Sequence, residues 1–189
     1  MKTSKTGDIH FSAIENDNLL RRLFFPPRRL VRPHVKEKDT VADLGCGPGF
    51  FTIALAGLVG PAGKVYAVDS DDKVVRIVLE KAAARGLGNI DARTASAADI
   101  GFIGDAAVDF VFAHGLLCAM AREGHAAAVS EIARILKPDG RAYLSAAKSS
   151  IGHVDREEWE GILSRFEVLR RGEGFPVLAN RWALVRRKP

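Results

Sequence analysis

The feature that most restricts the fold of this chain is a glycine-rich turn between two regular segments. The turn and its flanks read Asp43-Leu44-Gly45-Cys46-Gly47-Pro48-Gly49-Phe50-Phe51-Thr52. Residues 40–44 before it are typical of a short strand, and residues 50–59 after it predict a helix. Glycine lets the backbone adopt positive φ and approach a ligand, and a helix begins with unpaired N–H groups. A strand, a glycine turn and a helix in this order predict a nucleotide-binding loop.

Regular segments alternate along the rest of the chain. Strands are predicted over residues 40–44, 64–69, 90–94, 108–113, 141–146, 166–170 and 181–186, and helices over 16–25, 28–35, 50–59, 71–87, 122–136 and 155–164. Strands that alternate with helices indicate a parallel sheet covered on both faces. The last two strands have no helix between them and are expected to pair as an antiparallel hairpin. Lys137-Pro138-Asp139-Gly140 is expected to form a turn, because Pro and Gly occupy positions that turns favour.

Two other nucleotide loops compete with this interpretation of the turn. A dinucleotide dehydrogenase needs glycines at the first, third and sixth places, but the sixth place counted from Gly45 is Phe50. Asp43 would also repel a pyrophosphate, whereas it suits a positively charged ligand. A P-loop is excluded because no Gly-Lys-Ser/Thr follows the turn. A glycine-rich connection that binds nothing is the remaining structural alternative.

Asp43 to Gly49 resembles the first signature of class I S-adenosylmethionine-dependent methyltransferases, Asp-x-Gly-x-Gly-x-Gly. The resemblance covers roughly residues 36–147. Within the family, this chain is similar to the broad group that includes quinone-biosynthesis methyltransferases. It implies S-adenosyl-L-methionine as cofactor. The implied fold class is α/β, a Rossmann-like, doubly wound, mostly parallel seven-stranded sheet with an antiparallel last strand. Residues 36–189 would form this methyltransferase domain, and residues 1–35 an N-terminal helical lid segment.

The resemblance also implies a set of cofactor-binding residues at the ends of the predicted strands. They are Asp43, Gly45, Cys46, Gly47, Gly49, Asp69, Ser70, Ser96, Ala97 and His114. Asp69 ends the second strand and is expected to accept both ribose hydroxyls in a charge-assisted contact. Capping of the following helix is its alternative role, which Ser70 could fill instead. The sequence therefore predicts that the cofactor's ribose lies over the second strand.

The adenine subsite departs from the family's pattern. When the segment is aligned through Asp99 and Ile100, Ser96 stands where the family has an acidic residue that holds the adenine amino group. The backbone N–H of Ala97 would reach the ring. Ser can accept one hydrogen bond but carries no charge. Adenine is therefore expected to be held less tightly, and Asp99 is expected to cap a turn.

His114 follows the fourth predicted strand and is expected to contact the cofactor; proton transfer is its second possible role. A sulfonium methyl group is already a strong electrophile, so orientation supplies much of the catalysis and no metal is expected. A general base is needed only when the acceptor carries a proton that must leave. No catalytic residue is assigned for this reason.

The acceptor is not identified by the sequence. Ala113-His114-Gly115-Leu116 lacks the Asn/Asp-Pro-Pro-aromatic motif of exocyclic-amine methylation, and Leu117-Cys118-Ala119 lacks the context of a pyrimidine-carbon nucleophile. A small-molecule acceptor is the expectation. Seven basic residues beside Phe24 and Phe25 keep an RNA methyltransferase open as an alternative: Arg21, Arg22, Arg28, Arg29, Arg32, Lys36 and Lys38. A non-catalytic cofactor-binding module is the other alternative, and Ser96 gives it some support.

Composition narrows the setting. The chain has 189 residues, enough for one domain with a hydrophobic core. Its formal net charge is +5, and proteins with such a modest positive charge occur both with and without acidic partners such as nucleic acid. No apolar run approaches the ~18 residues that cross a bilayer, and no apolar stretch follows Met1 as in a signal peptide. Cys46 and Cys118 are too few for a disulfide framework or a zinc cluster. A cytoplasmic protein with no membrane association is therefore expected, and its oligomeric state is unknown.

Overall fold

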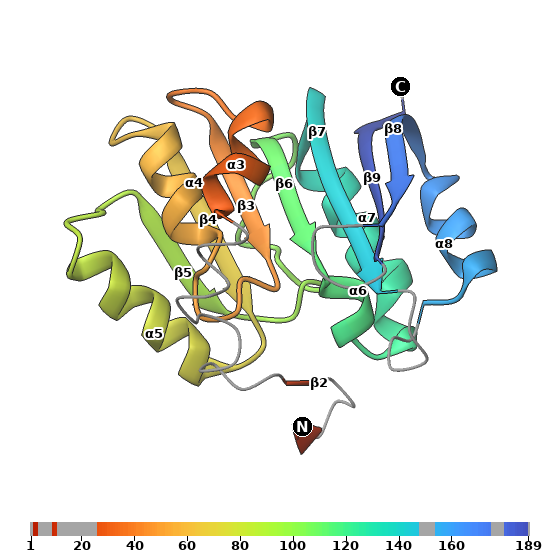
Figure 1. Cartoon of the computed structure of the whole chain (residues 1–189), viewed down its shortest axis with the longest axis horizontal. Coiled ribbons are helices and arrows are strands. Elements are labelled where there is room, and N and C mark those ends of the chain that lie inside the picture. Colours follow the sequence, from red (N-terminus) through yellow and green to blue (C-terminus); the bar gives the residue numbers. More distant parts are fainter. Residues whose placement is uncertain (1, 4–8, 11–25, 148–153, 175–179, 189) are drawn as a thin grey trace.

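The computed structural model describes residues 2–3, 9–10, 26–147, 154–174 and 180–188, and every structural statement below concerns these residues. Its centre is a seven-stranded sheet in the order β5-β4-β3-β6-β7-β9-β8 (Figure 1). The strands are β3 (Thr40–Leu44), β4 (Lys64–Asp69), β5 (Ile90–Thr94), β6 (Val108–His114), β7 (Leu136–Ala147), β8 (Phe166–Glu173) and β9 (Asn180–Arg187). A separate antiparallel pair consists of β1 (Lys2–Thr3) and β2 (Ile9–His10).

The direction of the strands confirms the predicted fold class. β5, β4, β3, β6 and β7 are joined by parallel pairings, and β9 is antiparallel to both β7 and β8. The chain starts the sheet at β3 in the middle, moves outward to β5, and returns through β6 to the other half. The crevice where a doubly wound sheet binds its ligand lies at this reversal, beyond the carboxyl ends of β3 and β6.

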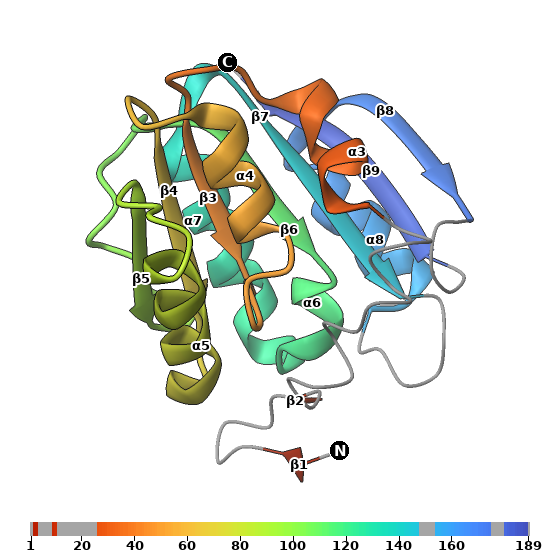
Figure 2. The same cartoon turned by 60° about the vertical axis from the view of Figure 1, so that its left-hand side comes forward.

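Helices cover both faces of the sheet (Figures 1 and 2). They are α3 (Pro27–Val31), α4 (Thr52–Val59), α5 (Asp72–Ala83), α6 (Leu116–Ala119), α7 (His125–Ile135) and α8 (Arg156–Leu163), with 3-10 turns η1 (Arg32–His34) and η2 (Arg122–Gly124). Buried residues of α3 and α4 form one core with Phe110 and Tyr143, and those of α7 and α8 form another with Val111 and Leu144. Alternate residues of the central strands thus enter opposite cores.

Several predicted bounds are corrected by the structure. The helix predicted over 28–35 ends as α3 at Val31 and continues as η1, which contains Pro33. The helix predicted over 71–87 begins one residue later and ends at Ala83, before Gly86 at φ +63°. The short helix α6 was not predicted. The helix predicted over 16–25 lies outside the described residues.

The turn predicted at residues 137–140 is wrong, because these residues belong to β7. The pairing with β6 jumps from Val108–Leu136 to Phe110–Arg141, so β7 advances by five residues where β6 advances by two. A Cβ on Gly140 would lie 2.9 Å from the carbonyl oxygens of Lys137 and Val108. Pro and Gly therefore mark a bulge within a continuing strand rather than a reversal of the chain.

Candidate active site

The predicted site residues converge because their strands are parallel and in register. Asp43 lies beside Ala67, and Asp69 lies beside Thr94, so β3, β4 and β5 end at the same edge of the sheet. His114, the last residue of β6, belongs to the same edge. The glycine loop, the acidic end of β4, the segment after β5 and the end of β6 thus surround one crevice.

The three glycines of the loop have different surroundings. Gly45, Gly47 and Gly49 have φ of +74°, +50° and +83°, which side-chain-bearing residues rarely adopt. A Cβ on Gly45 would lie 3.1 Å from the side chain of Leu116, and one on Gly49 would lie 3.1 Å from Val78. A Cβ on Gly47 would meet nothing within 4 Å. The outer glycines allow close packing, whereas Gly47 leaves space at the mouth of the crevice for a ligand.

Asp69 joins this loop to the end of β4. Its Oδ2 accepts a hydrogen bond from the backbone N–H of Gly47 at 2.9 Å, and its Oδ1 accepts one from Asp71 at 3.0 Å. The N-cap of α5 is Asp71, which accepts from the N–H of Lys73, so the alternative cap roles of Asp69 and Ser70 are wrong. Both carboxylate oxygens of Asp69 are therefore held by backbone N–H groups, one from the glycine loop and one from the start of α5.

Asp43 is a buried carboxyl group below the loop. Its side chain is 3% exposed, and its Oδ2 accepts a 2.6 Å hydrogen bond from Thr52 Oγ1 at the start of α4. Burial raises the pKa of Asp43 from 3.8 to about 7; the bond from Thr52 opposes this shift, and the nearby charge of Asp69 adds to it. A cation in the crevice would stabilise the ionised form of Asp43. Two acidic groups under one loop fit a positively charged ligand.

Cys46 and Ala97 lie at the crevice but turn their side chains inward. Cys46 packs with Ala67 and Val78, and its backbone N–H donates to the carbonyl of Val68. Burial raises the pKa of its thiol well above the usual value. Ala97 belongs to the core on the face of α7. Only backbone groups of these two residues can therefore face a ligand.

Ser96 is exposed after β5, and its Oγ accepts a hydrogen bond from the N–H of Ala98 at 3.2 Å. The carbonyl of Ser96 accepts the N–H of Asp99, which closes a turn. The sequence predicts that Asp99 caps this turn. In the structure the hydroxyl of Ser96 makes the side-chain hydrogen bond of the turn instead. Its second lone pair remains able to accept from a ligand.

His114 is half-buried at the end of β6 and lies among aromatic rings. Its ring centroid is 5.3 Å from that of Phe51 and 5.8 Å from that of Phe112. His114 Nδ1 is 2.9 Å from the hydroxyl of Ser145, which occupies the neighbouring position on β7. The ring is therefore oriented by a specific polar contact and by packing.

Three supporting residues were not found from the sequence. Thr52 closes the loop's motif, but a bond to Asp43 is not apparent from its spacing. Lys81 on α5 donates from Nζ to the carbonyl of Pro48 at 2.8 Å. Ser145 contacts His114 only because β6 and β7 are neighbours, a pairing between residues distant in sequence. Each depends on tertiary structure and gives no local signal.

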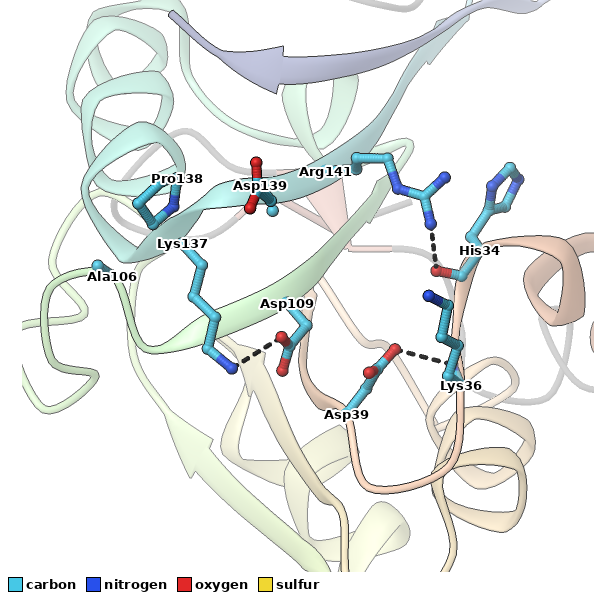
Figure 3. Close-up of a pocket in the computed structure, with 10 residues that line it drawn as sticks. His34, Lys36, Asp39, Ala106, Asp109, Lys137, Pro138, Asp139 and Arg141 are labelled. Carbon is cyan, nitrogen blue, oxygen red and sulfur yellow. Dashed lines mark hydrogen bonds and ion pairs between the residues drawn. The ribbon is translucent and has the colours of Figure 1, made fainter. Parts of the chain in front are cut away.

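A second cavity lies at the opposite edge of the sheet, near the amino ends of β3 and β6 (Figure 3). Its volume is about 410 Å³. It is lined by His34, Lys36, Asp39, Ala106, Asp109, Lys137, Pro138, Asp139, Gly140 and Arg141. Lys137 pairs with Asp109 at 2.7 Å, and burial together with Arg141 lowers the pKa of His34. Positive and negative side chains are balanced there, and the cavity is remote from the glycine loop.

The helix predicted over 16–25 and most of the predicted lid segment, residues 1–35, lie outside the part of the chain that the structure describes, which leaves out residues 1, 4–8 and 11–25. Val31 of α3 is fully buried against α4, whereas Arg28, Arg29 and Arg32 are exposed. Among the described residues, no helix is long and apolar enough to cross a membrane.

Comparisons with known proteins identify the family of this chain. A family profile described as a methyltransferase domain matches residues 41–140. Nocamycin O-methyltransferase of Saccharothrix syringae is 35% identical over 129 residues, which cover 65% of this chain and 44% of that protein. Demethylmenaquinone methyltransferase of Geobacillus stearothermophilus is 41% identical over 59 residues, 31% of this chain and 25% of that protein. The crystal structure of a SAM-dependent methyltransferase from Aquifex aeolicus is 26% identical with a TM-score of 0.76, covering 93% of this chain and 100% of that one.

The chain spans less than half the length of the two curated relatives, 44% and 25%. The profile match, residues 41–140 of 189, covers more than half of the chain and contains the glycine loop, Asp69 and His114. The strand order and directions agree with the same conclusion. This chain belongs to the methyltransferase domain family, as a class I S-adenosylmethionine-dependent methyltransferase with a Rossmann-like fold.

Proposed function

We propose that this chain transfers the methyl group of S-adenosylmethionine to a small-molecule acceptor. The observation that carries the proposal is the loop itself: Gly47 faces open space in front of Asp69, while Asp43 lies buried beneath. The cofactor supplies a sulfonium-activated methyl group when it is bound. The protein's part is to hold it, to orient the acceptor behind the methyl group and to exclude water.

The residues fit the cofactor as follows in this proposal. Asp69, which the bonds from Gly47 and Asp71 hold at the end of β4, accepts from the ribose hydroxyls. Asp43 stabilises the cationic methionine end through its charge. Ser96 and the backbone of Ala97 lie beside the adenine, with Ser70, Cys46 and the loop glycines lining the rest. His114 stands where the methyl group would be presented.

A small-molecule acceptor is favoured by what the relatives' names state, nocamycin and demethylmenaquinone, each said of that protein alone. RNA is the second candidate, and the exposed Arg28, Arg29 and Arg32 are the observation behind it. Binding to an unrelated RNA duplex that weakens steeply with salt would favour RNA. We further assign the protein to the reducing cytoplasm, on the basis of the free thiols of Cys46 and Cys118; cell fractionation tests this.

We also propose that residues 1–35 act as a lid over the acceptor. Figures 1 and 2 draw β2 on the side of the molecule toward which β6 points, the side of the glycine loop. A lid there would exclude water from the transfer. The competing role is structural, and the burial of Val31 against α4 supports it for the last part of the segment.

Calorimetric titration is the first test. The purified protein should bind S-adenosylmethionine and S-adenosylhomocysteine but not NAD, because Phe50 replaces the third glycine of a dinucleotide loop. A cell extract treated with labelled cofactor should then yield a methylated product whose mass identifies the acceptor. Tighter binding of NAD would overturn the assignment. Cofactor binding without transfer to any extract component would support a non-catalytic module.

A further inference from the structure

The cavity at the amino ends of β3 and β6 takes no part in the proposed function (Figure 3). Its volume of about 410 Å³ lies within the ~300–1,000 Å³ that is usual for small-molecule sites. Its lining residues come from η1, the turn before β3, the start of β6 and the irregular part of β7. Four separate segments thus shape the cavity, at the edge of the sheet opposite the glycine loop.

The backbone around this cavity is irregular in three places. Residues 137–140 of β7 have no counterpart in the pairings with β6 or with β9. Ala106 lines the cavity at φ +49°, and Lys38 precedes the lining residue Asp39 at φ +71°. Within the part of the chain that the structure describes, these two are the non-glycine residues with positive φ. Bulges and strained residues concentrate at functional sites, where they aim side chains, so the backbone favours a binding role for this cavity.

Six charged side chains line the cavity, three cations and three carboxylates. They are Lys36, Lys137, Arg141, Asp39, Asp109 and Asp139. Lys137 and Asp109 satisfy each other, since Lys137 Nζ lies 2.7 Å from Asp109 Oδ1. The second oxygen of Asp109 accepts the N–H of Thr40 at 2.8 Å. The other two cations and the other two carboxylates remain for a ligand.

The two remaining cations have unused hydrogen-bond donors. In the described part of the chain, the Arg141 side chain makes one hydrogen bond, from Nη2 to the carbonyl of His34 at 3.3 Å. Lys36 bonds Asp39 through its backbone N–H, and its ammonium has no hydrogen bond or ion pair among the same residues. Figure 3 draws the ends of both side chains on the His34 side of the cavity. A guanidinium fork beside an ammonium fits a carboxylate, which accepts two parallel bonds from arginine.

The two remaining carboxylates also have unused acceptors. Asp39 Oδ2 accepts the backbone N–H of Lys36 at 2.7 Å, and no bond to Oδ1 occurs among the described residues. Asp139 is exposed on the irregular part of β7, where its carboxylate has no hydrogen bond or ion pair within the described chain. Burial, together with the charges of Arg141 and Arg170, lowers the pKa of His34, so its ring adds no positive charge at neutral pH. A simple anion would meet repulsion from the carboxylates and a simple amine from the cations, whereas a zwitterion complements both.

We propose that this cavity binds a free α-amino acid, with the carboxylate against the Arg141 guanidinium and the ammonium against Asp39 and Asp139. Lys36 adds a second positive charge beside the ligand's carboxylate. The uncharged lining residues, Ala106 and Pro138, face the ligand's side chain. This site is separate from the cofactor crevice and does not depend on the proposed function.

Calorimetric titration of the full chain tests the ligand class. Each L-amino acid that proteins contain is titrated into the protein, and the tightest is compared with its amide, which lacks the carboxylate, and its N-acetyl form, which lacks the ammonium. Both derivatives should bind at least about tenfold more weakly, or ~1.4 kcal/mol. Saturating S-adenosylhomocysteine should leave the affinity unchanged, which separates this cavity from the cofactor crevice. Equal affinities of the three forms, or no binding of any amino acid at about 10 mM, would overturn the inference.

Substitutions test the location. Arg141→Gln and Asp139→Asn each remove one charge at nearly constant size, and each should weaken amino-acid binding at least about tenfold. Asp139 is exposed, so its variant keeps the test valid if Arg141→Gln fails to fold. Arg171→Gln is the matched control, because Arg171 is an exposed arginine on β8 that pairs with Glu160 outside the cavity. It should bind like the wild type. Full affinity in Asp139→Asn, or an equal loss in Arg171→Gln, would refute this placement of the ligand.

Discussion

Replacing Asp43 by Asn should stabilise the protein, and increasingly so as the pH rises. The pKa of Asp43 is raised from 3.8 to about 7 because the carboxyl group is buried. The folded state therefore prefers the protonated form; stability is complete below the unfolded-state pKa and is lost as the pH rises toward the folded-state pKa. Three pKa units at about 1.4 kcal/mol each correspond to a loss on the order of 4 kcal/mol. Asn keeps an acceptor for Thr52 and carries no such loss.

Urea denaturation followed by circular dichroism measures this effect. The difference in unfolding free energy, Asp43→Asn minus wild type, should be on the order of 4 kcal/mol larger near pH 8 than near pH 4. Asp72→Asn is the matched control, since Asp72 is an exposed carboxylate paired with Arg76 on α5. Its difference from wild type should vary little over the same range. A pH-independent difference for Asp43→Asn would mean that the buried group has an ordinary pKa, and the reasoning would fail.

Cofactor binding provides the functional half of the same experiment. A cation stabilises ionised Asp43, so the affinity of the wild type for S-adenosylmethionine should weaken as the pH falls below about 7, by at most tenfold per unit. S-adenosylhomocysteine lacks the sulfonium charge and should show the weaker dependence. Asp43→Asn should bind both ligands more weakly at high pH. Ionised Asp43 lowers the stability of the folded protein, and its contribution to cofactor binding would explain why a carboxyl group stands below the loop.

Three further changes test the site and the N-terminal segment. Asp69→Ala should weaken cofactor binding by roughly 1.5–3 kcal/mol, measured by calorimetry, while the protein stays folded; unchanged binding with a collapsed melting temperature would make Asp69 purely structural, through its bond to Gly47. Ser96→Asp should tighten cofactor binding, because a carboxylate can cap the same turn and adds charge toward the adenine amino group; weaker or equal binding would refute the alignment through Asp99. Deleting residues 1–26 should leave cofactor affinity within about tenfold, or ~1.4 kcal/mol, but abolish turnover. Full turnover would rule out the lid, and failure to fold would favour the structural role.

The fold and the main binding loop could be predicted because their signals are local. The glycine spacing from Gly45 to Gly49 and the alternation of strands and helices lie within short windows of sequence. The bulge at residues 137–140 could not be distinguished from a turn, since Pro138 and Gly140 favour both. Whether residues 137–140 form a bulge or a turn depends on how β7 pairs with β6, and this pairing is a property of the tertiary structure.

The sequence predicts which residues lie at the strand ends that form the candidate site, but it does not predict the hydrogen bonds between their side chains. The sequence places acidic residues at 69, 71 and 72 in close succession, and only the geometry of α5 shows that Asp71 is the cap. The contact between His114 and Ser145 joins residues 31 positions apart and follows from the register of β6 and β7. Residues 11–25 lie outside the described part of the chain, so their predicted helix and lid stay predictions.

The bond between Asp69 and Gly47 has a consequence for the thermodynamics of ligand entry. The N–H of the central glycine is tied to a side chain of the neighbouring strand, so the shape of the loop is set when the protein folds. Immobilising a flexible glycine turn has a conformational entropy cost that would otherwise oppose association. Here that entropy is lost when the protein folds, so the ligand binds to a loop that is already ordered. Association should consequently be limited by diffusion and by opening of the crevice rather than by rearrangement of the loop.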